Sequence, residues 1–170
     1  MPSSARRPIG AAATILMATL AAGASAAPAL AAEPFELTLP AGSACDFALV
    51  INGTPSANRV DKEFTDESGR VVRTISAGKG STLIFTNALS GATVELESNG
   101  SVSKASIDPD GSSTVAATGH NVIILFPSDV PAGPTTTLYT GRVVYKSTAT
   151  SDFTIVSTSG HTRDICAEID

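Results

Sequence analysis

The chain of 170 residues contains no tryptophan, and aromatic residues make up only 5% of it. Sugar-binding platforms stack the carbohydrate ring on exposed Trp or Tyr side chains, so this composition argues against one. The only tyrosines, Tyr139 and Tyr145, are six residues apart in a predicted strand and therefore share a face. We expect both at the rim of a hydrophobic core rather than on a ligand platform.

The sequence also lacks any cluster of basic residues. It has 11 Lys and Arg against 16 Asp and Glu, a formal net charge of −5. If Arg6 and Arg7 are removed with the leader described below, nine basic residues remain and the net charge is −7. Phosphate backbones and anionic lipids attract basic patches, so we expect neither nucleic acid nor a membrane surface as a partner. The acidic stretch Asp61–Glu67 is expected to be a solvated strand edge.

Cysteine is scarce, and the two that occur, Cys45 and Cys166, do not form a C-x-x-C pair. That spacing gives no support to a redox or metal site, whereas an even pair in an exported protein predicts one structural disulfide. Closing so long a loop stabilises a fold by about 4–5 kcal/mol in the chain-entropy model. The bridge further predicts that the first and last strands are neighbours.

The first 32 residues have the features of a signal peptide. Arg6 and Arg7 precede an apolar run over residues 9–22, and small residues with A-x-A cleavage patterns follow. The run is too short for a bilayer core of about 30 Å. We expect residues 1–32 to be the signal peptide, residues 33–170 to be one domain, and the protein to be secreted without a membrane anchor. General secretion and twin-arginine export both stay open, and the incomplete arginine motif favours the first.

Residues 33–170 show the two-residue periodicity of β-strands and no sustained helical period. Phe35–Leu39 and Ala92–Glu97 alternate, Asp108–Gly111 predicts a turn, and residues 136–146 predict a strand with a bend at Gly141. Further predicted strands cover residues 45–51, 70–75, 81–86, 102–107, 113–118, 121–126, 153–158 and 164–167. The spacing predicts an all-β fold, a single antiparallel β-sandwich that is immunoglobulin-like and holds one disulfide.

Four of the connections carry more specific expectations. Asn52-Gly53 and Asn99-Gly100 predict tight turns, and residues 77–80 are expected to join two neighbouring strands into a hairpin. The longest predicted loop, residues 127–135, contains three prolines and is the segment expected to make contacts with a partner.

Only two histidines are available for acid–base or metal chemistry. His120 and His161 each follow a glycine, and Asp164 lies three residues after His161. A zinc site needs three or four ligands, and no such spacing is present, so we predict no metal and no catalytic residue. A polar site built from His120, His161 and Asp164 stays open, since a catalytic triad is defined by geometry rather than by spacing.

Several segments together resemble a group of uncharacterised small secreted β-domain proteins of actinomycetes. They are Cys45–Phe47, Glu63–Arg70, Phe85–Asn87, Thr118–Asn121, Tyr139–Val144 and Gly160–Ala167. The resemblance covers nearly all of residues 33–170. It implies export and a single β domain, and it carries over no catalytic residue.

We therefore expect a secreted, non-catalytic binding or structural domain without a cofactor. Its partner would be a protein or a cell-envelope component. The alternative is a small secreted hydrolase or metal-dependent enzyme that uses His161 and Asp164. The enzyme predicts a polar cleft in which His161 meets a carboxylate and a serine, whereas the binding domain predicts dispersed histidines and an exposed apolar patch.

Overall fold

The computed structural model describes residues 33–56, 58–98, 100–150 and 152–170. The predicted signal peptide, residues 1–32, lies outside the described residues. Over the ranges it describes, the structure contains no helix with the length and hydropathy of a membrane span.

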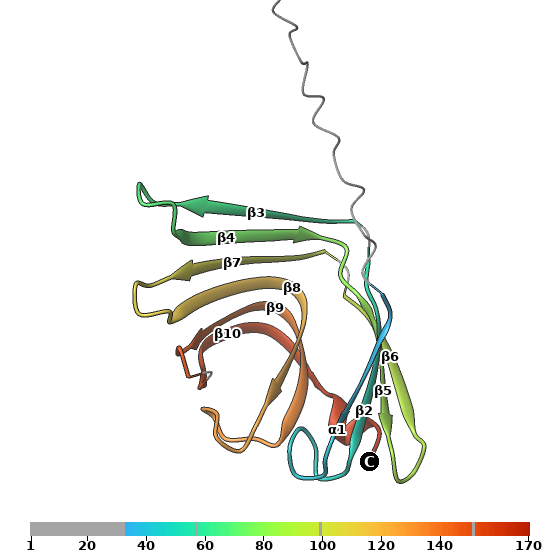
Figure 1. Ribbon diagram of the computed structural model, residues 1–170. Coiled ribbons are helices and arrows are strands. Elements are labelled where there is room, and N and C mark those ends of the chain that lie inside the picture. Colours follow the sequence, from blue (N-terminus) through green and yellow to red (C-terminus); the bar gives the residue numbers. More distant parts are fainter. Residues whose placement is uncertain (1–32, 57, 99, 151) are drawn as a thin grey trace, which may run out of the picture.

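The described residues form two antiparallel sheets and one short helix (Figure 1). The small sheet has the order β1 (Phe35–Leu39), β2 (Leu49–Thr54), β5 (Thr82–Asn87) and β6 (Thr93–Glu97). The large sheet has the order β10 (Phe153–Asp164), β9 (Thr135–Ser147), β8 (Ser113–Leu125), β7 (Ser101–Ile107), β4 (Val71–Gly78) and β3 (Arg59–Thr65). The helix α1 (Ile165–Glu168) follows β10 directly. The prediction of an all-β, immunoglobulin-like sandwich is confirmed.

Three glycines form a row across the large sheet. Gly119 of β8 pairs with Gly141 of β9, and Gly141 pairs with Gly160 of β10. All three have positive φ, and a Cβ on any of them would come within 2.2–2.4 Å of a carbonyl oxygen of the adjacent backbone. Only glycine fits such a position. β8, β9 and β10 curve strongly in Figure 1, and the glycine row lets these long strands bend without ending.

The bend divides the interior into two hydrophobic cores. The first lies between the small sheet, α1 and the parts of β8 after Gly119 and of β9 before Gly141. Phe85, Leu138 and Ile165 are fully or almost fully buried in it. The second lies around Ala117 and Val143 inside the bend. The Tyr139 and Tyr145 rings pack against this second core, so the prediction that they lie at a core rim is confirmed.

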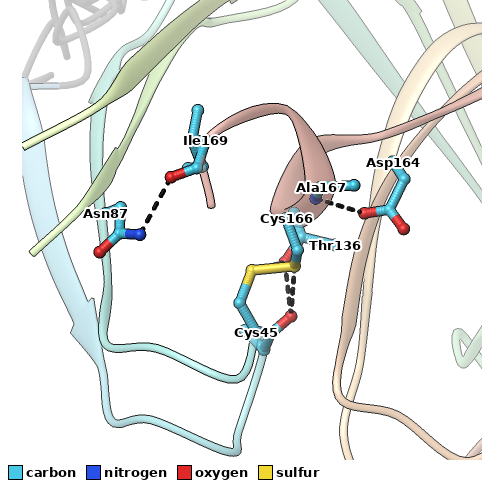
Figure 2. Close-up of a disulfide and its surroundings, with 8 residues drawn as sticks. Cys45, Asn87, Thr136, Asp164, Cys166, Ala167 and Ile169 are labelled. Atoms are coloured by element: carbon cyan, nitrogen blue, oxygen red, sulfur yellow. Dashed lines mark hydrogen bonds between the residues drawn. A yellow bond between two sulfur atoms is a disulfide. The ribbon is translucent and has the colours of Figure 1, made fainter. Parts of the chain in front are cut away.

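The Cys45–Cys166 disulfide is present, with the two Cα atoms 5.5 Å apart. It joins the β1–β2 loop to α1, as Figure 2 shows. The prediction that it makes the first and last strands neighbours is wrong, because β1 belongs to the small sheet and β10 to the large one. The short helix α1 follows β10 of the large sheet and places Cys166 against the small sheet. The strand predicted over residues 164–167 is therefore wrong, because most of this segment is α1.

Two hydrogen bonds near the bridge fix the surrounding segments (Figure 2). The buried Thr136 hydroxyl donates to the Ala44 carbonyl oxygen at 3.0 Å. The buried Asn87 amide donates to the Ile169 carbonyl oxygen at 2.9 Å. The residues after α1 are therefore held on the small sheet by β5 as well as by the sulfurs.

The predicted connections differ from the observed ones. Asn52-Gly53 lies inside β2, where the missing side chain of Gly53 makes room for the Phe35 ring. β4 and β5 do not form a hairpin, because the chain crosses from the large sheet to the small sheet after Gly78. β6 and β7 are likewise in different sheets, and Asn99 lies outside the described residues.

The predicted contact loop is tied to the fold. The buried Asp129 carboxylate accepts hydrogen bonds from the Phe126 and Phe153 amides at 2.7 and 3.3 Å. Val130 forms a parallel bridge with Thr154 of β10, supported by two backbone hydrogen bonds of 2.9 and 2.8 Å. The loop extends the β10 edge, and Val130 remains more than half exposed there.

Candidate functional site

Three connections cross between the sheets at the same edge: β2 to β3, β4 to β5, and β6 to β7. Two of them pair with each other, since the Gly80 amide donates to the Ser98 carbonyl oxygen at 2.6 Å and the Ser98 amide to that of Ser81 at 3.2 Å. Beyond Thr118, β8 has no further pairing with β7. The edge of β8 after the glycine row therefore borders the space where the two sheets diverge.

A cleft of about 300 Å³ occupies this space, and we call it the junction cleft. Its polar lining comes from four strands and two of the crossing connections. The polar side chains are Arg59, Ser81, Ser98, Ser101, Ser103, His120 and Asn121, together with Tyr145. The apolar lining is Leu83, Ala117, Val122 and Ile123. None of these lining residues is an acid, so the cleft favours a ligand group that accepts hydrogen bonds.

Arg59, the first residue of β3, supplies the positive charge of the junction cleft. Its Nε donates to the Ser76 hydroxyl at 2.6 Å and its Nη1 to the buried Ser101 hydroxyl at 3.4 Å. The Asp61 carboxylate lies 3.9 Å from Nε. A guanidinium carries five N–H donors, and these two hydrogen bonds use two of them. The group is held in place while donors remain for a ligand.

Asn121 lies two residues after the bend, at the edge of β8 that borders the cleft. Its Nδ2 atom is buried and, among the described residues, has no hydrogen-bond partner. Leaving such a donor unsatisfied costs about 1–3 kcal/mol, which a ligand oxygen would recover. The unsatisfied Asn121 Nδ2 donor therefore favours a ligand-binding site over a gap that only reflects imperfect packing.

An apolar groove of about 210 Å³ adjoins the junction cleft. Leu83 and Val122 line both spaces, so the junction cleft and the apolar groove adjoin at these two side chains. The other groove residues are Phe35, Leu37, Ile51, Phe85 and Ile124. Phe35 and Leu37 are 46% and 45% exposed on β1, which is the edge strand of the small sheet. The two spaces together offer hydrogen-bond donors at one end and hydrocarbon contacts at the other.

The structure brings the two histidines into one row but keeps Asp164 away from them. His120 and His161 both pair with Thr140, one from each side, so their Cα atoms are about 10 Å apart. His120 lines the junction cleft, whereas His161 is exposed on β10. Asp164 falls on the opposite face of β10, and its carboxylate accepts the Ala167 amide at 3.1 Å as the N-cap of α1.

Metal or acid–base chemistry gains no support from this geometry. Across residues 33–170, apart from the three positions left undescribed, no group of three or more His, Cys, Asp or Glu is placed to hold a metal ion. Burial raises the pKa of the Tyr145 phenol, so near neutral pH this side chain lines the cleft as a hydrogen-bond donor without charge.

Three hairpin tips at one end of the large sheet each contain an aspartate that organises its turn. Hydrogen bonds from the Ser68 hydroxyl and the Arg70 amide, among others, lower the pKa of Asp66 to about 2. The Ser112 hydroxyl lowers the pKa of Asp110, and the Thr150 hydroxyl lowers that of Asp152. All three side chains are at the surface, and their role is in the turns rather than in the cleft.

Sequence reasoning did not find Arg59, Ser101 or Asn121 as site residues. Arg59 begins β3 and Ser101 begins β7, and the two come close because both pair with Gly78 of β4, which lies between these strands. Asn121 did carry a signal, since it is a polar residue at the start of an otherwise apolar strand segment.

Comparison with known proteins identifies no relative of this chain. No family model matches the chain, and neither the curated proteins nor the solved structures contain a significant match.

Proposed function

We propose that this protein is an exported, non-catalytic binding protein whose ligand is an amphiphile with an anionic or otherwise oxygen-rich head group. The head group would lie in the junction cleft near Arg59 and Asn121, and the hydrocarbon part in the adjoining groove. The observation that carries this proposal is that Leu83 and Val122 line both spaces, so that the polar cleft and the apolar groove adjoin.

Two further features support export and binding rather than catalysis. The predicted signal peptide and the Cys45–Cys166 disulfide both suit an oxidising compartment outside the cell. His161 and Asp164 lie on opposite faces of β10, which removes the acid–base pair that the enzyme alternative needs. No observation favours that alternative specifically.

The proposal is tested with 1-anilinonaphthalene-8-sulfonate, an amphiphilic anion whose fluorescence rises in apolar surroundings. The chain has no Trp, so there is no indole emission to interfere. We expect saturable binding at one site by the folded protein. 1-Anilinonaphthalene without the sulfonate should bind more weakly, because it lacks the group that meets Arg59.

A matched pair of variants locates the site. Leu83→Gln changes a side chain that lines both spaces, whereas Ile84→Gln changes the next residue, which points out of the opposite face of the small sheet. We expect Leu83→Gln to weaken binding about tenfold or more and Ile84→Gln to leave it unchanged. Both proteins must first show the same unfolding midpoint, since partly folded chains also bind the dye. Equal affinities for the two variants, or no binding by the native protein, would overturn the proposal.

A further inference from the structure

The large sheet carries a cationic surface that the sequence does not reveal. Strand alternation and register place five basic side chains on the face of this sheet that points away from Ala117 and Val143. They are Lys62 on β3, Arg73 on β4, Lys104 on β7, and Arg142 and Lys146 on β9. All five are exposed, and we call this surface the basic face.

None of the five cations of the basic face forms an ion pair among the described residues. The ion pairs among the described residues involve Arg59, Arg70 and Arg163, none of which belongs to this face. The acidic residues of β3, Asp61 and Glu63, alternate with Lys62 and Phe64 and point to the other side of the sheet. The strand positions between the five cations are uncharged: Ile75, Ala77, Val102, Ser106, Thr114, Ala116, Thr118 and Val144.

One aromatic ring positions two of the five cations. The Arg73 guanidinium lies 4.2 Å and the Lys62 ammonium 5.0 Å from the centroid of the Phe64 ring. Cation–π contacts of this kind keep both groups at the sheet surface. The basic face is thus partly organised before any ligand binds.

The spacing of the cations exceeds the size of a single small anion. Strands lie about 4.8 Å apart, so Lys62 and Lys104, two strands apart in one register row, are separated by about 10 Å. Arg142 and Lys146 are four residues apart on β9, or about 13 Å. From β3 to β9 the field extends about 19 Å. A ligand that meets all five charges must carry several anions along its length.

We propose that the basic face binds a flexible linear polymer with one phosphate in each repeat, outside the cell. The sheet is twisted, so a planar bilayer cannot meet all five cations at once, whereas a flexible chain can follow the surface (Figure 1). Among the residues that the structure describes, no helix or two-stranded ribbon stands out from this face to enter a duplex groove. Small and hydroxyl-bearing residues such as Thr114, Ala116 and Thr118 leave room for the polymer between the long cationic side chains.

Binding is measured on the purified protein with long-chain inorganic polyphosphate as the probe and orthophosphate as the single-anion control. We expect binding to polyphosphate and none to orthophosphate at the same phosphate concentration. A plot of the logarithm of the association constant against the logarithm of the salt concentration should be linear. Its slope should be roughly −0.7 for each phosphate that the protein contacts.

Two double variants with the same change of net charge test the location. Lys104→Gln with Lys146→Gln removes charge from the basic face, and Arg70→Gln with Lys79→Gln removes it elsewhere. We expect the first pair to weaken polyphosphate binding about tenfold or more and to lower the salt dependence, while the second changes affinity less than twofold. Neither pair lines the junction cleft, so dye binding there should persist in both.

Three results would overturn the proposal. The native protein could fail to bind polyphosphate. The two double variants could lose affinity equally, which would make net charge rather than the basic face responsible. Finally, vesicles of phosphatidylglycerol or a DNA duplex could bind more tightly than polyphosphate at equal phosphate concentration, which would assign the face to a membrane or to nucleic acid.

Discussion

Gly119 of β8 and Gly141 of β9 face each other at the point where both strands change direction, and both have positive φ. A Cβ on Gly141 would lie 2.3 Å from the Ser159 carbonyl oxygen of β10. Backbone atoms cannot move away as a flexible side chain can. The bend, and with it both the second core and the position of Asn121, depends on this pair.

Gly141→Ala should therefore destabilise the fold by about 2–5 kcal/mol, the sum of the positive-φ cost and the overpacking cost. Gly69→Ala is the control, because Gly69 has a φ of +82° and open space where its Cβ would lie. It should cost about 1–2 kcal/mol. Urea unfolding of both variants measures the difference, and equal losses would contradict a packing role for the glycine row.

The disulfide should make a large contribution to stability. Its cysteines are 121 residues apart in the sequence, and the chain-entropy model gives about 5 kcal/mol for a loop of this length. The double variant Cys45→Ala with Cys166→Ala should unfold at a much lower urea concentration than the native protein. Adding a reductant should lower the native midpoint to a similar value and leave the variant unchanged. A native midpoint that does not respond to reduction would contradict this prediction.

Asp129 should be needed to hold the 126–134 loop on β10. Asp129→Ala leaves the Phe126 and Phe153 amides without their acceptor, at a cost of about 2–4 kcal/mol. Asp129→Asn keeps one acceptor oxygen and should cost less. Hydrogen exchange of the Phe153 and Ile155 amides reports the attachment of the loop, and unchanged protection in Asp129→Ala would contradict it.

Acid should weaken the β3–β4 hairpin through Asp66. The folded pKa of about 2 lies below the usual value of 3.8, so this carboxylate stabilises the fold above pH 3.8. The contribution decreases as the pH falls from 3.8 and is lost below about 2. Asp66→Asn should reduce the fall of the thermal midpoint over this interval, whereas Glu67→Gln, at the same tip, should follow the native curve.

Local features of the fold could be predicted from the sequence because strands carry a two-residue pattern. The alternation in Phe35–Leu39 and the turn at Asp108–Gly111 required only neighbouring residues, and both are present, with Gly111 at φ +85°. The predicted strands 113–118 and 121–126 are one strand, because Gly119 bends β8 without interrupting its pairing to β9. The sequence around a glycine looks the same whether the strand ends at that glycine or only bends there.

The pairing of distant strands and the binding surfaces could not be predicted in this way. Nothing near Gly78 distinguishes a crossing from a hairpin, since the difference lies in which sheet accepts the next strand. The same limit applies to charge: Lys62, Lys104 and Lys146 are each isolated in the sequence, and only the strand register gathers them on one face of the sheet.

The helix α1 has a consequence for biogenesis. Ile165 and Ile169 are 0% and 1% exposed, and they complete the first core next to Leu49 and Phe85. A chain that still lacks these two residues leaves the space they fill in the first core open to water, so this core cannot reach its final packing until both have been synthesised.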